Sequence, residues 1–184
     1  IIDTGGHIRD REERTFSAAD RIVAEVKNRT QAAGKIILFG HSAGGQFVHR
    51  WALLGGKKNV DVIAVANSGW FTMPDRDIDY PYGIKNVGIT EAFAEPVILF
   101  MGEKDVERKP PFRDTPEADA QGMNRMERCM NYFRQCKAKA EELRVPFRWK
   151  LEIVEGAAHQ GVKMAEGAAA YIFGKSSEDG NRRV

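Results

Sequence analysis

The sequence predicts an α/β fold, with a mostly parallel sheet and helices on both faces. Two observations carry this prediction. Short apolar runs typical of buried strands alternate along the chain with longer stretches of helical periodicity, and such alternation favours parallel strands joined by crossover helices. The length of 184 residues suits a single domain. We therefore expect one α/β domain over residues 1–174 and a polar, disordered tail over residues 175–184.

Three segments have the periodicity of a helix. They are residues 17–32, where Thr15 or Ser17 can serve as the N-cap, and residues 121–143 and 161–173. Apolar residues recur at helical spacing in the first of them at Ala18, Ile22, Val23 and Val26. The second is expected to be a long amphipathic helix with a methionine-rich stripe that faces the core, as such stripes usually do. This stripe consists of Met123, Met126, Met130 and Phe133.

Four segments predict strands. Three are short apolar runs that indicate buried strands, and the fourth alternates apolar and polar residues. They are residues 35–39, 61–66, 96–101 and 147–154. Open parallel sheets place their functional groups at the carboxyl ends of strands, so the residues that directly follow these segments are the candidates for chemistry.

The stretch Gly40-His41-Ser42-Ala43-Gly44 joins the first predicted strand to a predicted helix over residues 45–54. A serine between two glycines at a strand-to-helix turn matches the nucleophile elbow, a strained turn that exposes the hydroxyl above the sheet. The helix N-terminus at this point favours developing negative charge. Glycines also mark ordinary turns, but the strand and helix on either side favour Ser42 as a nucleophile. We expect positions 40 and 44 to require small residues.

A serine nucleophile needs a base, and the four histidines differ in context. His159 follows the last predicted strand in a loop of small residues, where an imidazole can reach a neighbour, and it is the favoured base. His49 lies two turns beyond the elbow and is expected to pack or to face solvent. His7 lies near the start of the sequence, where chains fray. His41 lies inside the elbow, and its side chain is expected to point away from the reacting face.

Asp105 and Glu103 compete as the acid that orients the base. Both follow the third predicted strand, in the loop Gly102-Glu103-Lys104-Asp105. An exposed carboxylate in such a loop is usually only solvated. The Gly-x-x-Asp spacing leaves room for the chain to turn off the strand, which favours Asp105 as the partner of His159. Glu103 remains the alternative.

The chain resembles an α/β hydrolase, and more narrowly the bacterial poly(3-hydroxybutyrate)-depolymerase-like hydrolases. The similarity runs from about residue 16 to residue 173, and the chain order Ser, Asp, His is that of the superfamily. The elbow is specific to the superfamily, whereas the other matching stretches are less specific. The matching stretches are residues 39–50, 66–70, 81–83, 102–105, 121–122 with Arg125 and Arg128, and 156–159.

This resemblance implies ester hydrolysis, or amide hydrolysis as in related polyamide-degrading enzymes, with Ser42, Asp105 and His159 as the triad. It also implies that the backbone N–H of Ala43 binds the oxyanion together with a second donor from an upstream loop. Members of the superfamily place several more strands before the elbow than the 41 residues preceding Ser42 can form. We therefore expect either the C-terminal portion of a longer protein, lacking the N-terminal strands, or an unusually reduced form of the fold, and in both cases Gly5-Gly6 is expected to be a turn.

Two long connections follow predicted strands. The first, residues 67–95, is rich in aromatic residues, which would suit an apolar or polymeric acyl substrate if exposed and would anchor the connection if buried. His41, Ser68 and Trp70 are the candidate substrate-binding residues. The second connection, residues 106–120, contains two consecutive prolines and many charges, and a flexible surface loop is favoured over a lid.

Composition argues against several other functions. The formal net charge is +2 and the basic residues are scattered, so we expect no nucleic-acid or membrane partner. Residues 75–79 are acidic but fail the pattern of a calcium loop at positions 80 and 86. Cys129 and Cys136 are seven residues apart on a predicted helix, beyond disulfide reach, and are expected to be buried free thiols. We expect no metal, no cofactor, and a soluble protein of the bacterial cytoplasm or a secreted one.

The predicted function is hydrolysis of a carboxylic ester, in the form of a small molecule or a polymer, through an acyl-enzyme. His159 takes the proton of Ser42 as the serine attacks the carbonyl, and Asp105 fixes the imidazole. The alternative is a non-catalytic hydrolase-fold domain used for binding or structure, because its oxyanion hole lacks the second donor.

Overall fold

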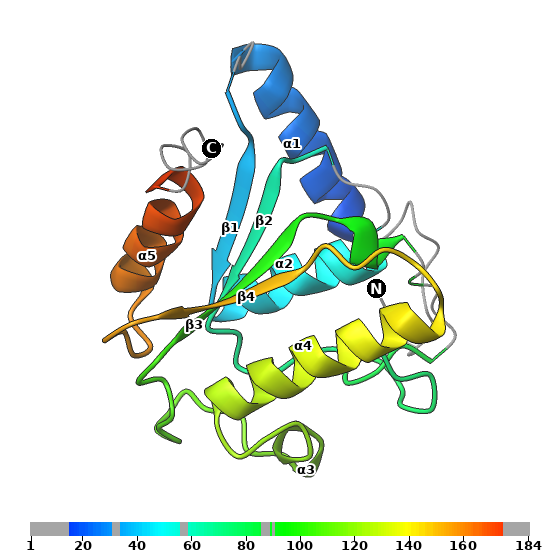
Figure 1. Cartoon of the computed structure of the whole chain (residues 1–184), viewed down its shortest axis with the longest axis vertical. Helices are drawn as coiled ribbons and strands as arrows, with labels where there is room; N and C mark the ends of the chain where they lie inside the picture. Colours follow the sequence, from blue (N-terminus) through cyan, green and yellow to red (C-terminus); the bar gives the residue numbers. More distant parts are fainter. Residues whose placement is uncertain (1–14, 31–33, 56–58, 86–88, 90, 175–184) are drawn as a thin grey trace, which may run out of the picture.

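The computed structural model describes residues 15–30, 34–55, 59–85, 89 and 91–174. These residues contain a four-stranded sheet in the order β1-β2-β3-β4, with every pair of neighbours parallel (Figure 1). The strands are β1 Ile37–His41, β2 Val62–Ala66, β3 Val97–Gly102 and β4 Lys150–Val154. The helices are α1 Thr15–Thr30, α2 Ala43–Leu54, α3 Pro116–Asp119, α4 Arg125–Glu142 and α5 Gly161–Gly174, with a 3₁₀ turn η2 at Ala92–Ala94. The predicted tail, residues 175–184, lies outside the described residues.

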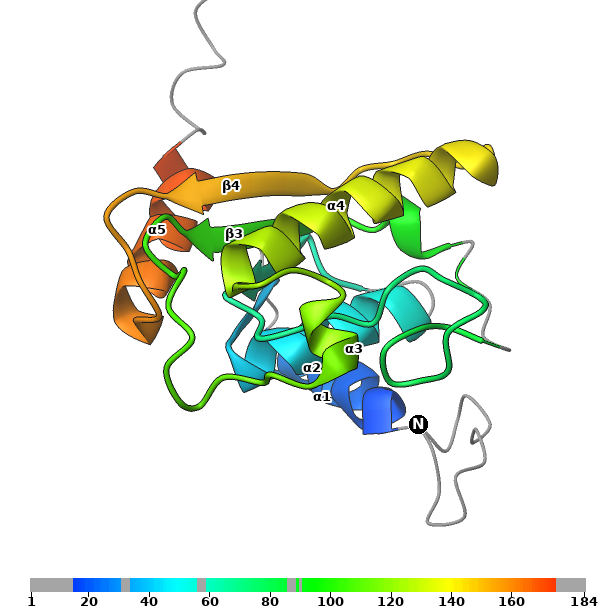
Figure 2. The same ribbon diagram turned by 90° about the horizontal axis from the view of Figure 1, so that it is seen from below.

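Helices cover both faces of the sheet, as the sequence predicts (Figures 1 and 2). Side chains of β2 alternate between the two faces because successive residues of a strand point in opposite directions. Ile63 and Val65 belong to the core shared with α2 and α4. Ala64 and Ala66 belong to the smaller core shared with α5. The expected parallel α/β architecture is therefore confirmed.

The central strands read as continuous apolar runs because both of their faces are covered. All six residues of β3 are buried, and four of the five residues of β2 are buried. The outer strands β1 and β4 are only partly buried. No helix in the described part of the chain is long and apolar enough to cross a membrane.

The face of α4 that packs on the sheet coincides only in part with the predicted methionine stripe, because Met126 and Phe133 pack against the core and the other two residues do not. Met123 precedes the helix, which starts at Arg125, and 55% of Met123 and 44% of Met130 are exposed. Met130 follows the buried Cys129 by one residue, which turns it about 100° around the helix and away from the sheet. The apolar residues that are buried on this helix are Cys129, Tyr132, Cys136 and Ala140.

The apolar stripe of α1 is only partly covered in the described structure. Phe16 and Val23 are buried, and the Phe16 ring lies 5.5 Å from that of Phe47 on α2. Ile22 and Val26 are 64% and 48% exposed. Helical spacing predicts the existence of α1, but the face it turns toward the protein is set by Phe16 and Val23.

Cys129 and Cys136 are free, buried thiols, as their spacing predicts. Burial raises the pKa of Cys129 to about 12. A thiol must lose its proton to act as a nucleophile, so this cysteine is part of the core and has no role in the chemistry.

His49 connects α2 to the segment after β2 from inside the core. Its Nε2 accepts the Thr72 N–H at 3.1 Å, so the proton of the neutral ring lies on Nδ1, which donates to the Gly45 carbonyl at 3.1 Å. Burial holds the pKa of His49 well below its usual value of 6.5, and the charge of Arg50 acts in the same direction. His49 is thus a packing residue, one of the two roles expected from the sequence.

The buried, neutral His49 predicts a pH-dependent stability. In the unfolded chain this residue takes up a proton near pH 6.5, whereas the folded state resists protonation, so the unfolded state binds more protons below that pH. The His49 contribution to the free energy of unfolding is complete above pH 6.5 and is lost below it, by up to about 1.4 kcal/mol per pH unit. Urea unfolding between pH 7.5 and 5 should give a shallower pH slope for His49→Gln than for the wild type. Equal slopes would contradict this account.

Candidate active site

The elbow is a tight turn between β1 and α2. Ser42 has φ 55° and ψ −115°, a positive φ that residues other than glycine rarely adopt. The Ser42 N–H donates to the Ala66 carbonyl at 2.9 Å, and the Ser42 carbonyl accepts from the Gln46 N–H at 2.9 Å. The strained serine is therefore held by the end of β2 on one side and by the first turn of α2 on the other.

Two of the elbow glycines are required by close contacts. A Cβ at Gly40 would overlap the Gly44 carbonyl, and a Cβ at Gly45 would lie 2.7 Å from Ser68 Oγ. A Cβ at Gly44 would meet nothing within 4 Å. The expectation of a small residue is thus right for Gly40 and wrong for Gly44. The close approach falls on Gly45 instead, because it is the α2 residue that faces the end of β2.

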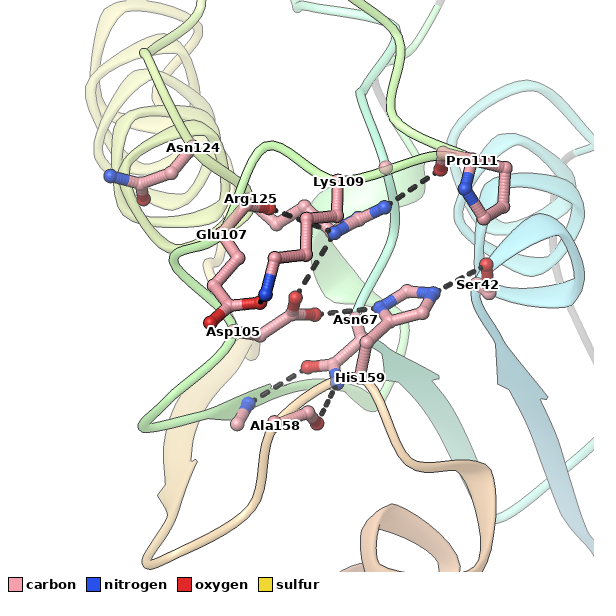
Figure 3. Close-up of polar contacts among 12 residues, drawn as sticks. Ser42, Asn67, Asp105, Glu107, Lys109, Pro111, Asn124, Arg125, Ala158 and His159 are labelled. Atoms are coloured by element: carbon pink, nitrogen blue, oxygen red, sulfur yellow. Dashed lines mark hydrogen bonds and ion pairs between the residues drawn. The ribbon is translucent and has the colours of Figure 1, made fainter.

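Ser42, His159 and Asp105 lie together at the carboxyl edge of the sheet (Figure 3). Ser42 Oγ is 2.9 Å from His159 Nε2, and His159 Nδ1 is 2.7 Å from Asp105 Oδ2. An ionised carboxylate only accepts hydrogen bonds, so Nδ1–H donates to it and Nε2 is free to accept the serine proton. Asp105 is 2% exposed, whereas Ser42 and His159 are half-buried. The three residues follow β1, β3 and β4.

Asn67 is a site residue that the sequence reasoning missed. It follows β2 with φ 44° and is fully buried. Its Oδ1 accepts the Gly102 N–H at 2.8 Å, and its Nδ2 donates to the Ala158 carbonyl at 2.9 Å. Asn67 thereby ties the end of β3 to the residue before His159. The sequence signal for this role is an asparagine directly after a buried strand. It indicates a residue that tolerates positive φ, but it does not indicate which groups the side chain will bind, so it is a weak signal.

Glu103 was the alternative candidate for the acid that orients His159, but its side chain has another hydrogen-bond partner. Its Oε2 accepts the Gly156 N–H at 2.8 Å, in the loop that leads to His159. The Lys104 N–H donates to the Ala157 carbonyl at 2.8 Å in the same loop. Glu103 therefore supports the loop from outside, while Asp105 contacts the imidazole.

The second oxygen of Asp105 contacts Arg125, a residue to which the sequence alone assigned no role. Arg125 Nη1 donates to Asp105 Oδ1 at 3.1 Å, and both side chains are buried. The carboxylate thus accepts from two side chains at once, the imidazole and a guanidinium (Figure 3).

The sequence predicts that the His41 side chain points away from the reacting face. This prediction is wrong, because the side chain lies beside His159. Its ring centroid lies 4.8 Å from that of His159, with a 45° tilt, and Nε2 has no hydrogen-bond partner among the described residues. Side chains alternate along β1, so Gly40 faces α2 whereas His41 faces the α5 side, where His159 returns to the sheet. Burial, and then His159, lower the pKa of His41. His41 therefore forms a neutral wall beside His159.

Ser68 and Trp70 are both buried, so neither is presented to solvent as a substrate contact. Ser68 is 1% exposed, and its hydroxyl lies behind the elbow against Gly45. Trp70 is 8% exposed and packs between the Tyr82 ring at 4.6 Å and the Arg50 guanidinium at 4.2 Å. We assign both residues to anchoring the segment after β2, the second of the two roles considered for its aromatic residues.

A cavity of about 210 Å³ opens beside the elbow. Ala43, the first residue of α2, is exposed, and its N–H belongs to the helix-terminal donors that have no partner within the helix. It borders this cavity, whose walls are Thr15, Phe16, Ala43, Gln46, Phe47, Arg50 and Tyr80. The cavity offers room next to Ala43 for part of a substrate. Two features discussed from the sequence, Gly5-Gly6 and His7, lie outside the described residues.

The part of the chain that the structure describes contains no group of three His, Cys, Asp or Glu side chains placed to hold a metal ion. The acidic segment considered as a calcium loop forms a local turn, in which the Asp77 N–H donates to Asp75 Oδ1 at 2.8 Å.

Two solved structures are similar to this chain. Poly(aspartic acid) hydrolase-1 from Sphingomonas sp. KT-1 has a TM-score of 0.84 and 34% identity, over 91% of this chain and 66% of that protein. A poly(3-hydroxybutyrate) depolymerase from Bordetella parapertussis has a TM-score of 0.87 and 29% identity, over 95% of this chain and 61% of that protein. The chain therefore spans somewhat less than two thirds of either neighbour. No family model and no curated protein matches the sequence.

The two candidate acids can be separated by amide substitutions. Asp105→Asn replaces an accepting oxygen next to His159 Nδ1, so if this oxygen orients the base of a hydrolase, we expect kcat to fall by about 10⁴-fold. Glu103→Gln keeps an oxygen that can accept the Gly156 N–H, so kcat should stay close to that of the wild type. Melting curves of both variants check that the fold is retained. Loss of activity in Glu103→Gln together with full activity in Asp105→Asn would reverse the assignment.

Proposed function

The chain has a depolymerase-like α/β-hydrolase fold, and on that premise we propose that it is a serine hydrolase acting on carboxylic esters. Ser42 is the nucleophile, His159 the base and Asp105 the orienting acid. The observation that supports the proposal most directly is the hydrogen-bonded chain through these residues, with distances of 2.7 Å and 2.9 Å. A nucleophile, a base within reach of it and a group that orients the base are the parts that covalent acyl transfer requires.

Acylation follows from this arrangement. Ser42 Oγ attacks the carbonyl carbon while His159 Nε2 takes the hydroxyl proton. Asp105 accepts from Nδ1–H, keeps the imidazole in the correct tautomer and stabilises the imidazolium that forms. The Ala43 N–H, at the N-terminus of α2, donates to the oxygen that becomes negative. The imidazolium then gives its proton to the leaving alkoxide, and the acyl group stays on Ser42.

Deacylation repeats these steps with water as the nucleophile. His159 Nε2 takes a proton from the water as the water attacks the acyl-serine carbonyl. The proton returns to Ser42 Oγ when the acid product leaves. The same two ring nitrogens of His159 therefore serve both halves of the reaction, with water in place of the serine hydroxyl in the second half.

The proposed substrate is a polymeric or small-molecule ester, with an amide as the variant. The Sphingomonas neighbour is named as a poly(aspartic acid) hydrolase and the Bordetella neighbour as a poly(3-hydroxybutyrate) depolymerase. The cavity beside Ala43 supports this proposal: Phe16 and Phe47 give it apolar walls, while Gln46 and Arg50 add polar groups. A short acyl group with polar substituents would fit such a lining.

Removing the Ser42 hydroxyl tests the proposed nucleophile. We expect Ser42→Ala to lower kcat for a soluble p-nitrophenyl ester by roughly 10⁴–10⁶-fold, since residues that act as a unit fail together. The change removes one oxygen at a half-buried position, so the circular dichroism spectrum should match that of the wild type.

Two outcomes would count against the proposal. Unchanged ester hydrolysis in Ser42→Ala would exclude this serine as the nucleophile. A folded wild-type chain that hydrolyses neither esters nor amides would instead favour the alternative, a hydrolase-fold domain used for binding or structure.

A further inference from the structure

Asp105 sits between two positively polarised partners inside the protein. Its Oδ2 contacts His159 Nδ1 at 2.7 Å and its Oδ1 contacts Arg125 Nη1 at 3.1 Å. Asp105 is 2% exposed and Arg125 is 4% exposed, so little solvent screens the pair. Figure 3 shows the guanidinium and the imidazole approaching different oxygens of the carboxylate. Both oxygens of the proposed acid are therefore occupied, and only one of them by the base.

Arg125 is itself held in place by the segment that follows Asp105. Its Nη2 donates to the Pro111 carbonyl at 2.8 Å, and its guanidinium lies 5.0 Å from the Phe112 ring. Arg125 is also the first residue of α4, directly after the N-cap Asn124, whose side chain accepts the Glu127 N–H. The start of α4 and the Pro111 carbonyl thus hold the guanidinium in position beside Asp105.

These contacts limit how the carboxylate can move. A carboxylate held through one oxygen can rotate about the bond to its Cβ, whereas one held through both oxygens cannot rotate without breaking a contact. A buried charge without its partner is also costly, so the pair holds one geometry. The imidazole tautomer depends on the direction of the Oδ2 contact, and misplacement of reacting groups by about 1 Å can lower a rate by about 10²-fold.

We propose that Arg125 is a positioning residue of this hydrolase, which acts through Asp105 on the orientation and the charge of His159. This inference rests on the proposed function. Arg125 holds the acid in line with the base. Because a guanidinium remains charged at all working pH values, it also opposes the positive charge that His159 acquires on protonation.

The effect of Arg125 on the charge of His159 has to be judged together with the other charged and titratable groups near His159 in the described structure. Asp105 favours a positive imidazole, whereas the charge of Arg125 on the other carboxylate oxygen disfavours one. His41, which packs against the His159 ring, is itself shifted toward its neutral form. Glu103 is occupied by the Gly156 amide, and the pair Glu107–Lys109 is exposed to solvent. Loss of the Arg125 charge should therefore raise the pH at which the base becomes active.

The test compares Arg125→Gln, Arg125→Lys and Arg128→Gln with the wild type in ester hydrolysis. In Arg125→Gln we expect kcat to fall by about 10²-fold with little change in KM, and the pH midpoint of kcat/KM to rise by about one unit. Arg125→Lys keeps the charge but loses the planar fork, so its midpoint should match that of the wild type while kcat stays reduced.

Arg128→Gln is the matched control. Arg128 is as buried as Arg125, lies one turn along α4 and contacts the same Phe112 ring. It donates to the Gly69 and Gly122 carbonyls and pairs with Asp119 rather than with Asp105. Its loss should lower the melting temperature and leave the pH midpoint unchanged, which separates positioning from general stability.

The outcomes are distinct. An active Arg125→Gln variant with the kcat and midpoint of the wild type would overturn the inference and leave the proposed function intact. If Arg125→Gln does not fold, a wild-type kcat in Arg125→Lys would overturn it instead. An equal midpoint shift in Arg128→Gln would also overturn it, because the shift would then reflect stability alone. A folded wild-type chain without hydrolase activity would refute the proposed function before any variant is compared.

Discussion

The parallel pairing of the four strands is the constraint on which the rest of the structure depends. Parallel strands bring their carboxyl ends to the same edge of a sheet, and the register aligns Ala66 with Phe100 and Gly102 with Val154. Ser42, Asp105 and His159 follow three of these strand ends and meet there, although 117 residues separate Ser42 from His159. A slip of one residue in any pair would turn the side chains of that strand to the opposite face and separate the groups.

The parts of the structure that the sequence could predict are those governed by local chemistry. Apolar runs marked β2 and β3 because both faces of these inner strands are covered, and a similar run marked the outer strand β1. The elbow was recognisable because Gly40 must avoid the Gly44 carbonyl, a requirement set by residues four apart. His159 and Asp105 could be chosen by elimination and by their places after strands. Such features can be predicted because residues close to one another in the sequence are enough to determine them.

The features that escaped prediction depend on partners far away in the chain. Asn67 matters because it joins Gly102 to Ala158, and Arg125 because it meets Asp105 in the interior. Nothing near either residue in sequence marks these contacts. The orientation of α4 was predicted only in part: Met126 and Phe133 do pack against the core, but the packing of Cys129 and Tyr132 decides which face is buried. The direction of the His41 side chain follows from strand alternation. Its contact with the His159 ring, however, depends on where the loop before α5 lies.

The central claim is that the folded chain activates the hydroxyl of Ser42. Mass spectrometry after reaction with a fluorophosphonate probe measures this most directly, since only an activated serine reacts readily. The account predicts a single adduct on the peptide that contains Ser42, which is absent after the chain is unfolded. A folded chain that acquires no adduct, or acquires one on another residue, would contradict it.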